Sequence, residues 1–194
     1  LNDGNDNVFV GADAGEDITT GQNNVAIGVN ALKSEAAGGR SVAIGKAALA
    51  FQKDGSTAAY NIAIGYDAGL SVTTGTKNTL IGGLAGDALT DGEHNTAIGY
   101  NSLSASQGAD YNTVLGSNAA AQLTTGDRNV AIGYKALNSE TDQGRAVAIG
   151  YEALENQNAS SNSYNVGIGY TAGTDVTTGI QNTLIGGQVG DALT

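Results

Sequence analysis

The sequence contains no cysteine, proline, methionine or tryptophan, and its other large aromatic residues are limited to eight Tyr and two Phe. The absence of cysteine excludes disulfides and thiolate metal sites. Gly occurs 30 times among 194 residues, and Ala supplies much of the hydrophobic fraction. A compact globule of this size would normally need bulkier side chains in its core.

Charged residues are also scarce, at 14% of the chain, and most of them are acidic. The 19 Asp and Glu against eight Lys and Arg give a net charge of −11. Nucleic-acid binding requires clustered basic residues, and anionic membranes attract basic segments. We therefore expect no nucleic-acid partner and no membrane contact in this segment, and no apolar run reaches the length of a membrane-spanning helix.

The chain instead repeats one motif, whose commonest form is N-V-A-I-G. With the Asn numbered as position 0, the copies lie 17 residues apart, except for two spacings of 20 and 19 residues. A second period of about 105 residues groups six units into a super-repeat. We expect 1–194 to be a single repetitive segment of a longer fibre. The position-0 residues of the eleven units are Asn7, Asn24, Ser41, Asn61, Asn78, Asn95, Asn112, Asn129, Ala146, Asn165 and Asn182.

Positions 1 to 3 of each unit predict a short β-strand. Position 1 is Val, Ile or Thr in every unit, and such β-branched residues favour strands. Position 2 is also mostly apolar, so we expect both faces of the strand to be buried. The predicted structural core is the position-3 column: Val10, Ile27, Ile44, Ile64, Ile81, Ile98, Leu115, Ile132, Ile149, Ile168 and Ile185.

The rest of the unit predicts how the chain returns. Gly at position 4 supplies a turn, and small residues at positions 7 and 8 predict a second, weaker strand before a polar loop. Two strands and two turns in 17 residues make one coil, so we predict an all-β, parallel β-solenoid (β-roll or β-helix) of about eleven coils, about 50 Å long. Stacked coils would form an amide ladder from Asn7, Asn24, Asn61, Asn78, Asn95, Asn112, Asn129, Asn165 and Asn182.

Each such coil offers only about three or four apolar side chains, which is little against the entropy cost of ordering the unit. We therefore expect one strand face to fill the coil and the other to meet partner chains. A parallel homotrimer is the leading prediction, and a head-to-tail filament of super-repeats is the alternative.

The repeats resemble those of two groups of fibrous proteins. The stretch "SVAIGKAALA" at 41–50 is similar to repeats in the heads of trimeric autotransporter adhesins, which form a left-handed parallel β-roll trimer. The stretches "NTAIGYNSL" at 95–103 and "TTGDRNVAIGYKAL" at 124–137 look closer to the shafts of phage tail fibres and of bacterial proteins that end in a self-cleaving fibre chaperone. The resemblance covers the whole chain and implies a trimeric fibre, although the adhesin-head unit is typically shorter.

Chemistry-bearing residues are few. His94, the only histidine, precedes a position-0 Asn in a predicted loop, and no repeated spacing joins Ser, His and Asp as a catalytic triad requires. We predict no enzyme, no cofactor and no metal centre, with calcium between acidic loops as an alternative. Tyr flanks the motif in eight places, which we interpret as ring contacts at coil corners or between chains, with sugar stacking as the alternative.

These observations favour a non-enzymatic structural rod of an extracellular fibre or surface adhesin. The alternatives are a phage tail-fibre shaft, located in a virion tail, and a carbohydrate-binding solenoid module. The two long spacings insert loops at 51–60 and 155–164, which are candidates for recognising a host surface or glycan. Their candidate residues are Tyr60, Tyr164 and Asn158, the last in the only N-x-S/T sequence.

Overall fold

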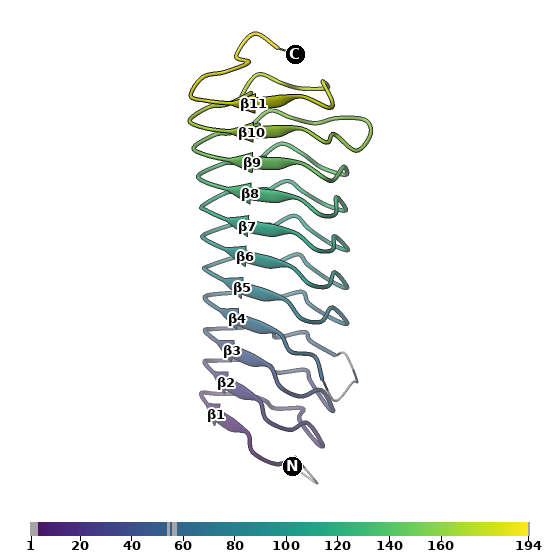
Figure 1. Ribbon diagram of the computed structural model, residues 1–194. Coiled ribbons are helices and arrows are strands. Elements are labelled where there is room, and N and C mark those ends of the chain that lie inside the picture. The colour runs from purple at the N-terminus through teal and green to yellow at the C-terminus, as the bar shows by residue number, and fades with distance from the viewer. Residues whose placement is uncertain (1–3, 54, 56–57, 194) are drawn as a thin grey trace.

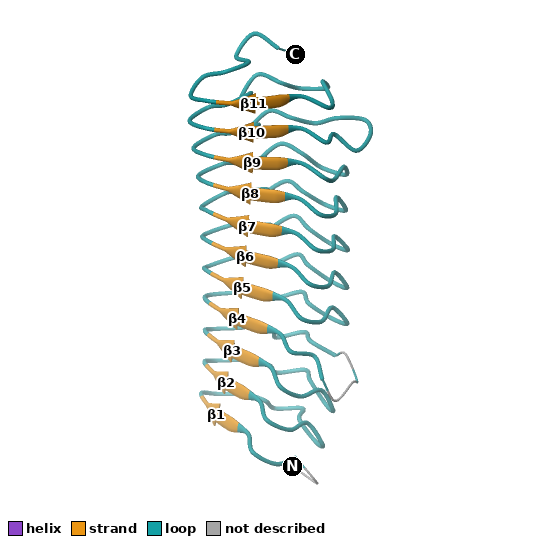
Figure 2. Cartoon of the chain, in the orientation of Figure 1, coloured by secondary structure: helices purple, strands orange, loops and turns teal. Residues whose placement is uncertain are grey.

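A computed structural model describes residues 4–53, 55 and 58–193. Within these ranges the chain forms eleven strands of three residues and no helix, so none that is long and apolar enough to cross a membrane (Figure 2). The strands are β1 (Val8–Val10), β2 (Val25–Ile27), β3 (Val42–Ile44), β4 (Ile62–Ile64), β5 (Thr79–Ile81), β6 (Thr96–Ile98), β7 (Thr113–Leu115), β8 (Val130–Ile132), β9 (Val147–Ile149), β10 (Val166–Ile168) and β11 (Thr183–Ile185).

All eleven strands belong to one parallel sheet, in which each strand pairs with the next along the chain to make a rod (Figure 1). Equivalent positions pair with each other, as Val8 does with Val25, so each position of the unit forms a column along the rod. Val42 still pairs with Ile62 across the first long spacing, so the ladder keeps its register there. The predicted all-β parallel solenoid is confirmed.

The prediction of a second strand near positions 7 and 8 is wrong. This part of the coil consists of turns, and positions 6 and 8 have positive φ in every coil, for example +60° at Asn30 and +50° at Leu32. Left-handed residues at two-residue intervals cannot make an extended strand. The turns of neighbouring coils are nevertheless joined by backbone hydrogen bonds, such as that from the Leu32 amide to the Ala48 carbonyl at 2.9 Å.

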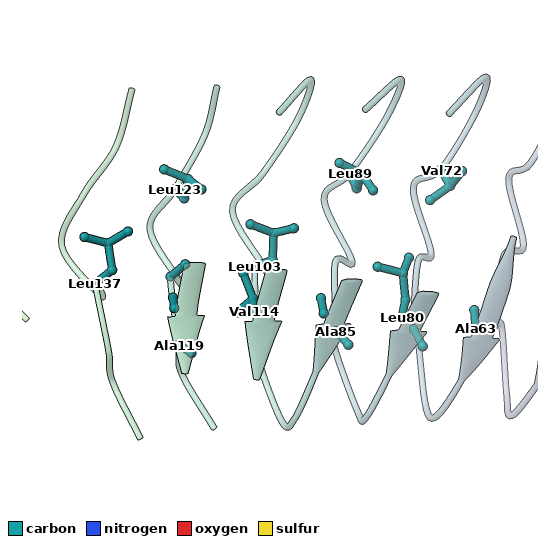
Figure 3. Packing of buried hydrophobic residues seen from close by; sticks show 14 of the residues in the cluster. Ala63, Val72, Leu80, Ala85, Leu89, Leu103, Val114, Ala119, Leu123 and Leu137 are labelled. Carbon is teal, nitrogen blue, oxygen red and sulfur yellow. The ribbon is translucent and has the colours of Figure 1, made fainter. Parts of the chain in front are cut away.

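The interior of the rod is filled mainly from four columns, at positions 2, 7, 8 and 11. Ala97, Ser102, Leu103 and Ser106 occupy these positions in one coil, and each is completely buried. Figure 3 shows Leu80, Leu103 and Leu137, from three different coils, following one another along the interior of the rod. The core is therefore narrow and continuous along the rod.

The position-3 column, which we expected to be the core, lies instead on the outer face of the sheet of the single chain. Because side chains alternate along a strand, an inward position 2 forces positions 1 and 3 outward. Four members of the column are clearly exposed: Val10 at 57%, Ile27 at 37%, Leu115 at 45% and Ile185 at 66%. The other seven are half-buried: Ile44, Ile64, Ile81, Ile98, Ile132, Ile149 and Ile168.

The strand and the turn share the space inside each coil. Where position 2 is Ala97, position 8 is Leu103, and where position 2 is Leu80, position 8 is Gly86. A Cβ atom added to Gly86 would lie 2.8 Å from a methyl carbon of Leu80, so the two positions cannot both be large. Most coils thus hold one large side chain in this space, which comes either from position 2 of the strand or from position 8 of the turn.

Gly at position 4 is required by both its conformation and its neighbours. Gly11 has φ of +128°, which side chains rarely adopt, and a Cβ there would lie 2.7 Å from the carbonyl carbon of Gly28 in the next coil. The same close approach recurs along the stacked coils, which explains why all eleven units carry this Gly.

Candidate interaction face

The outer face of the sheet is a continuous apolar band that the coil interior does not use. Columns 1 and 3 contain 22 residues, of which 18 are aliphatic (seven at position 1 and eleven at position 3) and four are Thr. On this face Val8 is 50% exposed and Ile62 is 37% exposed. An exposed apolar surface that runs the length of a chain marks an interaction site.

Two columns border this band, at positions −1 and 5, and together they contain all eight Tyr of the chain. Every residue in column −1 is exposed. Column −1 consists of Asp6, Asn23, Arg40, Tyr60, Lys77, His94, Tyr111, Arg128, Arg145, Tyr164 and Gln181. Column 5 consists of Ala12, Val29, Lys46, Tyr66, Gly83, Tyr100, Ser117, Tyr134, Tyr151, Tyr170 and Gly187.

In column −1, cations and rings stack on one another between coils. His94 stacks on Tyr111 with ring centroids 4.9 Å apart, and the Arg128 guanidinium lies 5.4 Å from the centre of the same ring. Arg145 lies 5.7 Å from the Tyr164 ring. Each exposed cation–ring contact contributes about 0.5–1 kcal/mol. His94 is therefore part of a surface stack.

In column 5, three consecutive coils carry Tyr134, Tyr151 and Tyr170. Their ring centroids are 5.2 and 5.3 Å apart, with interplanar angles of 23° and 12°. Rings stacked in this way cover each other's faces along the rod and present their edges and hydroxyls to solvent. Sugar binding by stacking needs an open ring face, so the geometry disfavours the sugar-binding interpretation for these three rings.

The charges of the chain are divided between this face and the rest of the rod. Columns −1 and 5 hold five of the eight Lys and Arg but, with Asp6, only one of the 19 Asp and Glu. Among the residues that the structure describes, the remaining three cations and 16 acids lie elsewhere in the coil. The outer face is thus mildly basic at its borders, whereas the turns and loops carry the acidic charge of the chain.

The position-0 Asn side chains form a hydrogen-bonded ladder just inside the sheet. The Asn78 Nδ2 donates to the Gly92 carbonyl at 2.7 Å, and its Oδ1 accepts from the Asn95 backbone amide at 2.9 Å. The same pair of bonds recurs in most coils, from Asn7 to Asn129, and Asn165 likewise binds Gly179 and Asn182. These bonds satisfy the loop carbonyl and the strand amide, which are otherwise buried.

Ser41 and Ala146 interrupt the ladder, and a second polar network lies beside each of them. The fully buried Glu35 accepts hydrogen bonds from the Gly38 amide at 2.7 Å and from Gln52 Nε2 at 3.0 Å. Gln52 Oε1 in turn accepts from Asn61 Nδ2 at 2.9 Å. The Gln amide thus takes over part of the missing Asn's role at the coil that carries the inserted loop.

The second network repeats the first six coils later. Glu140 accepts from Gln157 Nε2 at 2.9 Å, and Gln157 Oε1 accepts from Asn165 Nδ2 at 2.8 Å. Sequence reasoning missed both networks. The available signal was the recurrence of Glu and then Gln at position 11, at the same places in both super-repeats, where other coils mostly have Ile, Val or Leu.

The three residues expected in the recognition loops lie in two different parts of the coil. Tyr60 and Tyr164 directly precede β4 and β10 and belong to column −1, each beneath an Arg of the preceding coil. Only Asn158 lies in the body of an inserted loop, where it is exposed and its Oδ1 accepts from Thr141 Oγ1 at 3.2 Å. The 155–164 loop projects beyond the neighbouring coils (Figure 1), whereas residues 54, 56 and 57 of the other loop lie outside the described residues.

In the described part of the chain, no three His, Cys, Asp or Glu side chains gather as a metal site would require. Two shallow hollows, of about 240 and 380 Å³, lie among the loops near Ala37, and neither contains the histidine. Asp87 is a separate case, because its buried Oδ1 has no hydrogen-bond partner and burial raises the pKa of its carboxyl.

No family model, curated protein or solved structure matches this chain. Its function must therefore be inferred from its own residues and geometry.

Proposed function

We propose that this chain is a non-enzymatic structural rod of an extracellular fibre or surface adhesin, in which parallel copies associate through the outer faces of their sheets. The observation that carries the proposal is the apolar band of columns 1 and 3, which lies on the outer face of all eleven strands and is half-buried or exposed in the single chain. The resemblance of the repeats to adhesin heads favours three chains.

The size of the face supports association between copies. Ten strand spacings give a length of about 50 Å, and the six residue steps from column −1 to column 5 span at most about 20 Å. The product is on the order of 1,000 Å² per chain, which matches the area that each partner buries in a stable protein interface. Because the columns of equivalent chains have the same spacing, an in-register parallel arrangement would bring like columns together along the whole rod.

A phage tail-fibre shaft would use the same face, so it remains the alternative within this class. A carbohydrate-binding module is the alternative of another class, and the ring geometry of column 5 gives it less support. Glycan-array binding by the isolated chain would favour the carbohydrate-binding module.

The test is the oligomeric state of the purified chain, measured by light scattering coupled to size exclusion. We expect a defined oligomer for the native sequence and a shift towards monomer for Ile132→Asp, with the β-type circular dichroism retained in both. A native chain that stays monomeric at high micromolar concentration and unfolds cooperatively would contradict the proposal.

A further inference from the structure

We propose that Tyr134, Tyr151 and Tyr170 form an oxidative modification site, at which neighbouring coils are joined covalently through dityrosine. This inference goes beyond the rod function, and the reacting residues belong to one chain.

The geometry brings the three phenols into reach of each other. The centroids of Tyr134 and Tyr151 are 5.2 Å apart and those of Tyr151 and Tyr170 are 5.3 Å apart. The backbone holds this spacing, since the Glu152 amide donates to the Tyr134 carbonyl and the Thr171 amide donates to the Tyr151 carbonyl, both at 2.8 Å. The side chains are 40%, 44% and 57% exposed, so an oxidant has access and the rings have room to turn.

The chemistry needs a one-electron oxidant, for which a haem peroxidase with hydrogen peroxide is the class we name. Each phenol of a pair loses one electron and its hydroxyl proton to give a tyrosyl radical. The two radicals form a carbon–carbon bond between ortho carbons, and the two ortho hydrogens then move to the oxygens to restore the phenols. The pair has lost two hydrogen atoms, which reduce one hydrogen peroxide to two waters.

One neighbour of the stack suits this reaction. The Glu152 carboxylate accepts a hydrogen bond from the Tyr151 phenol and thereby raises the pKa of that phenol. The same carboxylate is placed to take the phenolic proton when the ring is oxidised. Tyr151 is also the middle ring, and its two ortho carbons allow it to couple to either neighbour.

The other tyrosines provide controls within the same chain. Tyr66 and Tyr100 belong to the same column, but the coil between them carries Gly83 and the coil after Tyr100 carries Ser117. The tyrosines of column −1 likewise have no Tyr in the adjacent coil. Only the 134, 151 and 170 positions place Tyr next to Tyr.

The experiment treats the purified full chain, at low micromolar concentration, with a haem peroxidase and hydrogen peroxide. Dityrosine fluorescence is measured, and digestion with trypsin and a Glu-specific protease followed by mass spectrometry locates the links. We expect a product that runs as a single chain on a denaturing gel, lacks the mass of two hydrogens per link, and links Tyr151 to Tyr134 or Tyr170. Its thermal midpoint should rise by about 5–10 °C, because a link between coils closes a short loop.

The matched variants are Tyr151→Phe and Tyr100→Phe, which keep the rings but remove one hydroxyl each. Tyr151→Phe should lose at least about nine-tenths of the fluorescence, whereas Tyr100→Phe should keep it. Equal yields from the two variants, or links found only between separate chains, would overturn the proposal. The oligomeric state is measured separately, so this result and the fate of the rod proposal can be told apart.

Discussion

The two faces of the same three-residue strands follow different rules. The inner face is graded coil by coil, because the size of position 2 is matched to the size of position 8, as with Ala97 and Leu103 or Leu80 and Gly86. The outer face is uniform, with an aliphatic residue at position 3 in every coil. The difference indicates that the inner face is constrained by a closed volume within one chain, whereas the outer face needs only a continuous apolar surface.

The sharpest way to test this difference is to place the same charge on either face of β8. Ala131 is completely buried, so Ala131→Asp should cost more than about 3 kcal/mol of unfolding free energy and prevent the surrounding coils from forming. Ile132→Asp, at the adjacent residue, should leave the single chain folded. Urea denaturation followed by circular dichroism compares the two, and similar losses would mean that the faces do not differ in this way.

The size matching inside the coil predicts a smaller effect that can be reversed. Leu103→Ala should cost about 2–4 kcal/mol, because it leaves a cavity in a continuous core. The double change Ala97→Leu with Leu103→Gly should recover much of the loss, since it copies the Leu80 and Gly86 pair of the preceding coil. If the double variant is less stable than Leu103→Ala in urea denaturation, positions 2 and 8 do not share the interior volume of the coil as described.

The buried polar networks predict a loss of similar or smaller size. Gln157→Leu removes the amide that binds Glu140 and Asn165, so a buried carboxylate oxygen loses a donor and the unfolding free energy should fall by about 1–3 kcal/mol. Gln122→Leu, at an exposed position, is the control and should be nearly neutral. Comparable urea midpoints for the two variants would show that the network does not support the coil.

The smallest expected effect is a gain. Burial raises the pKa of Asp87 above 3.8, so its charged form is disfavoured in the folded chain, and the fold loses stability as the pH rises from the unfolded value through the raised value. Asp87→Asn should therefore stabilise the chain at neutral pH, by less than about 1 kcal/mol because solvent screens this half-buried group. Thermal melts at several pH values should show this gain disappearing below about pH 3.8; a gain independent of pH would point to another cause.

The repeat sequence was enough to predict the strands, their parallel order and the columns, because every unit places the same residue types at the same spacing. It was not enough to choose the inner face, since positions 1, 2 and 3 are all mostly apolar. The alternation of side chains does not say which face of the strand points into the coil. The bulky position-3 residues suggested a core. The interior of the coil is narrow, however, and an Ala at position 2 is enough to fill it where position 8 is Leu. The turns at positions 6 to 8, where a second strand was predicted, were missed because left-handed residues such as Leu32 and Lys135 are not recognisable by residue type.

The Asn ladder gives the rod a direction. The shortest side-chain bonds of Asn78 reach forward along the chain, to the Gly92 carbonyl and the Asn95 backbone amide. Asn112 likewise bonds forward to Gly126 and Asn129, and its Nδ2 makes a longer bond of 3.2 Å back to Asn95 Oδ1. A finished coil therefore offers its successor an acceptor and a donor that are already in place. During synthesis, which begins at the N-terminus, each new coil would fold onto the coil before it as a template. Damage to one Asn would then be felt first by the coil that follows it, so errors in assembly would propagate towards the C-terminus.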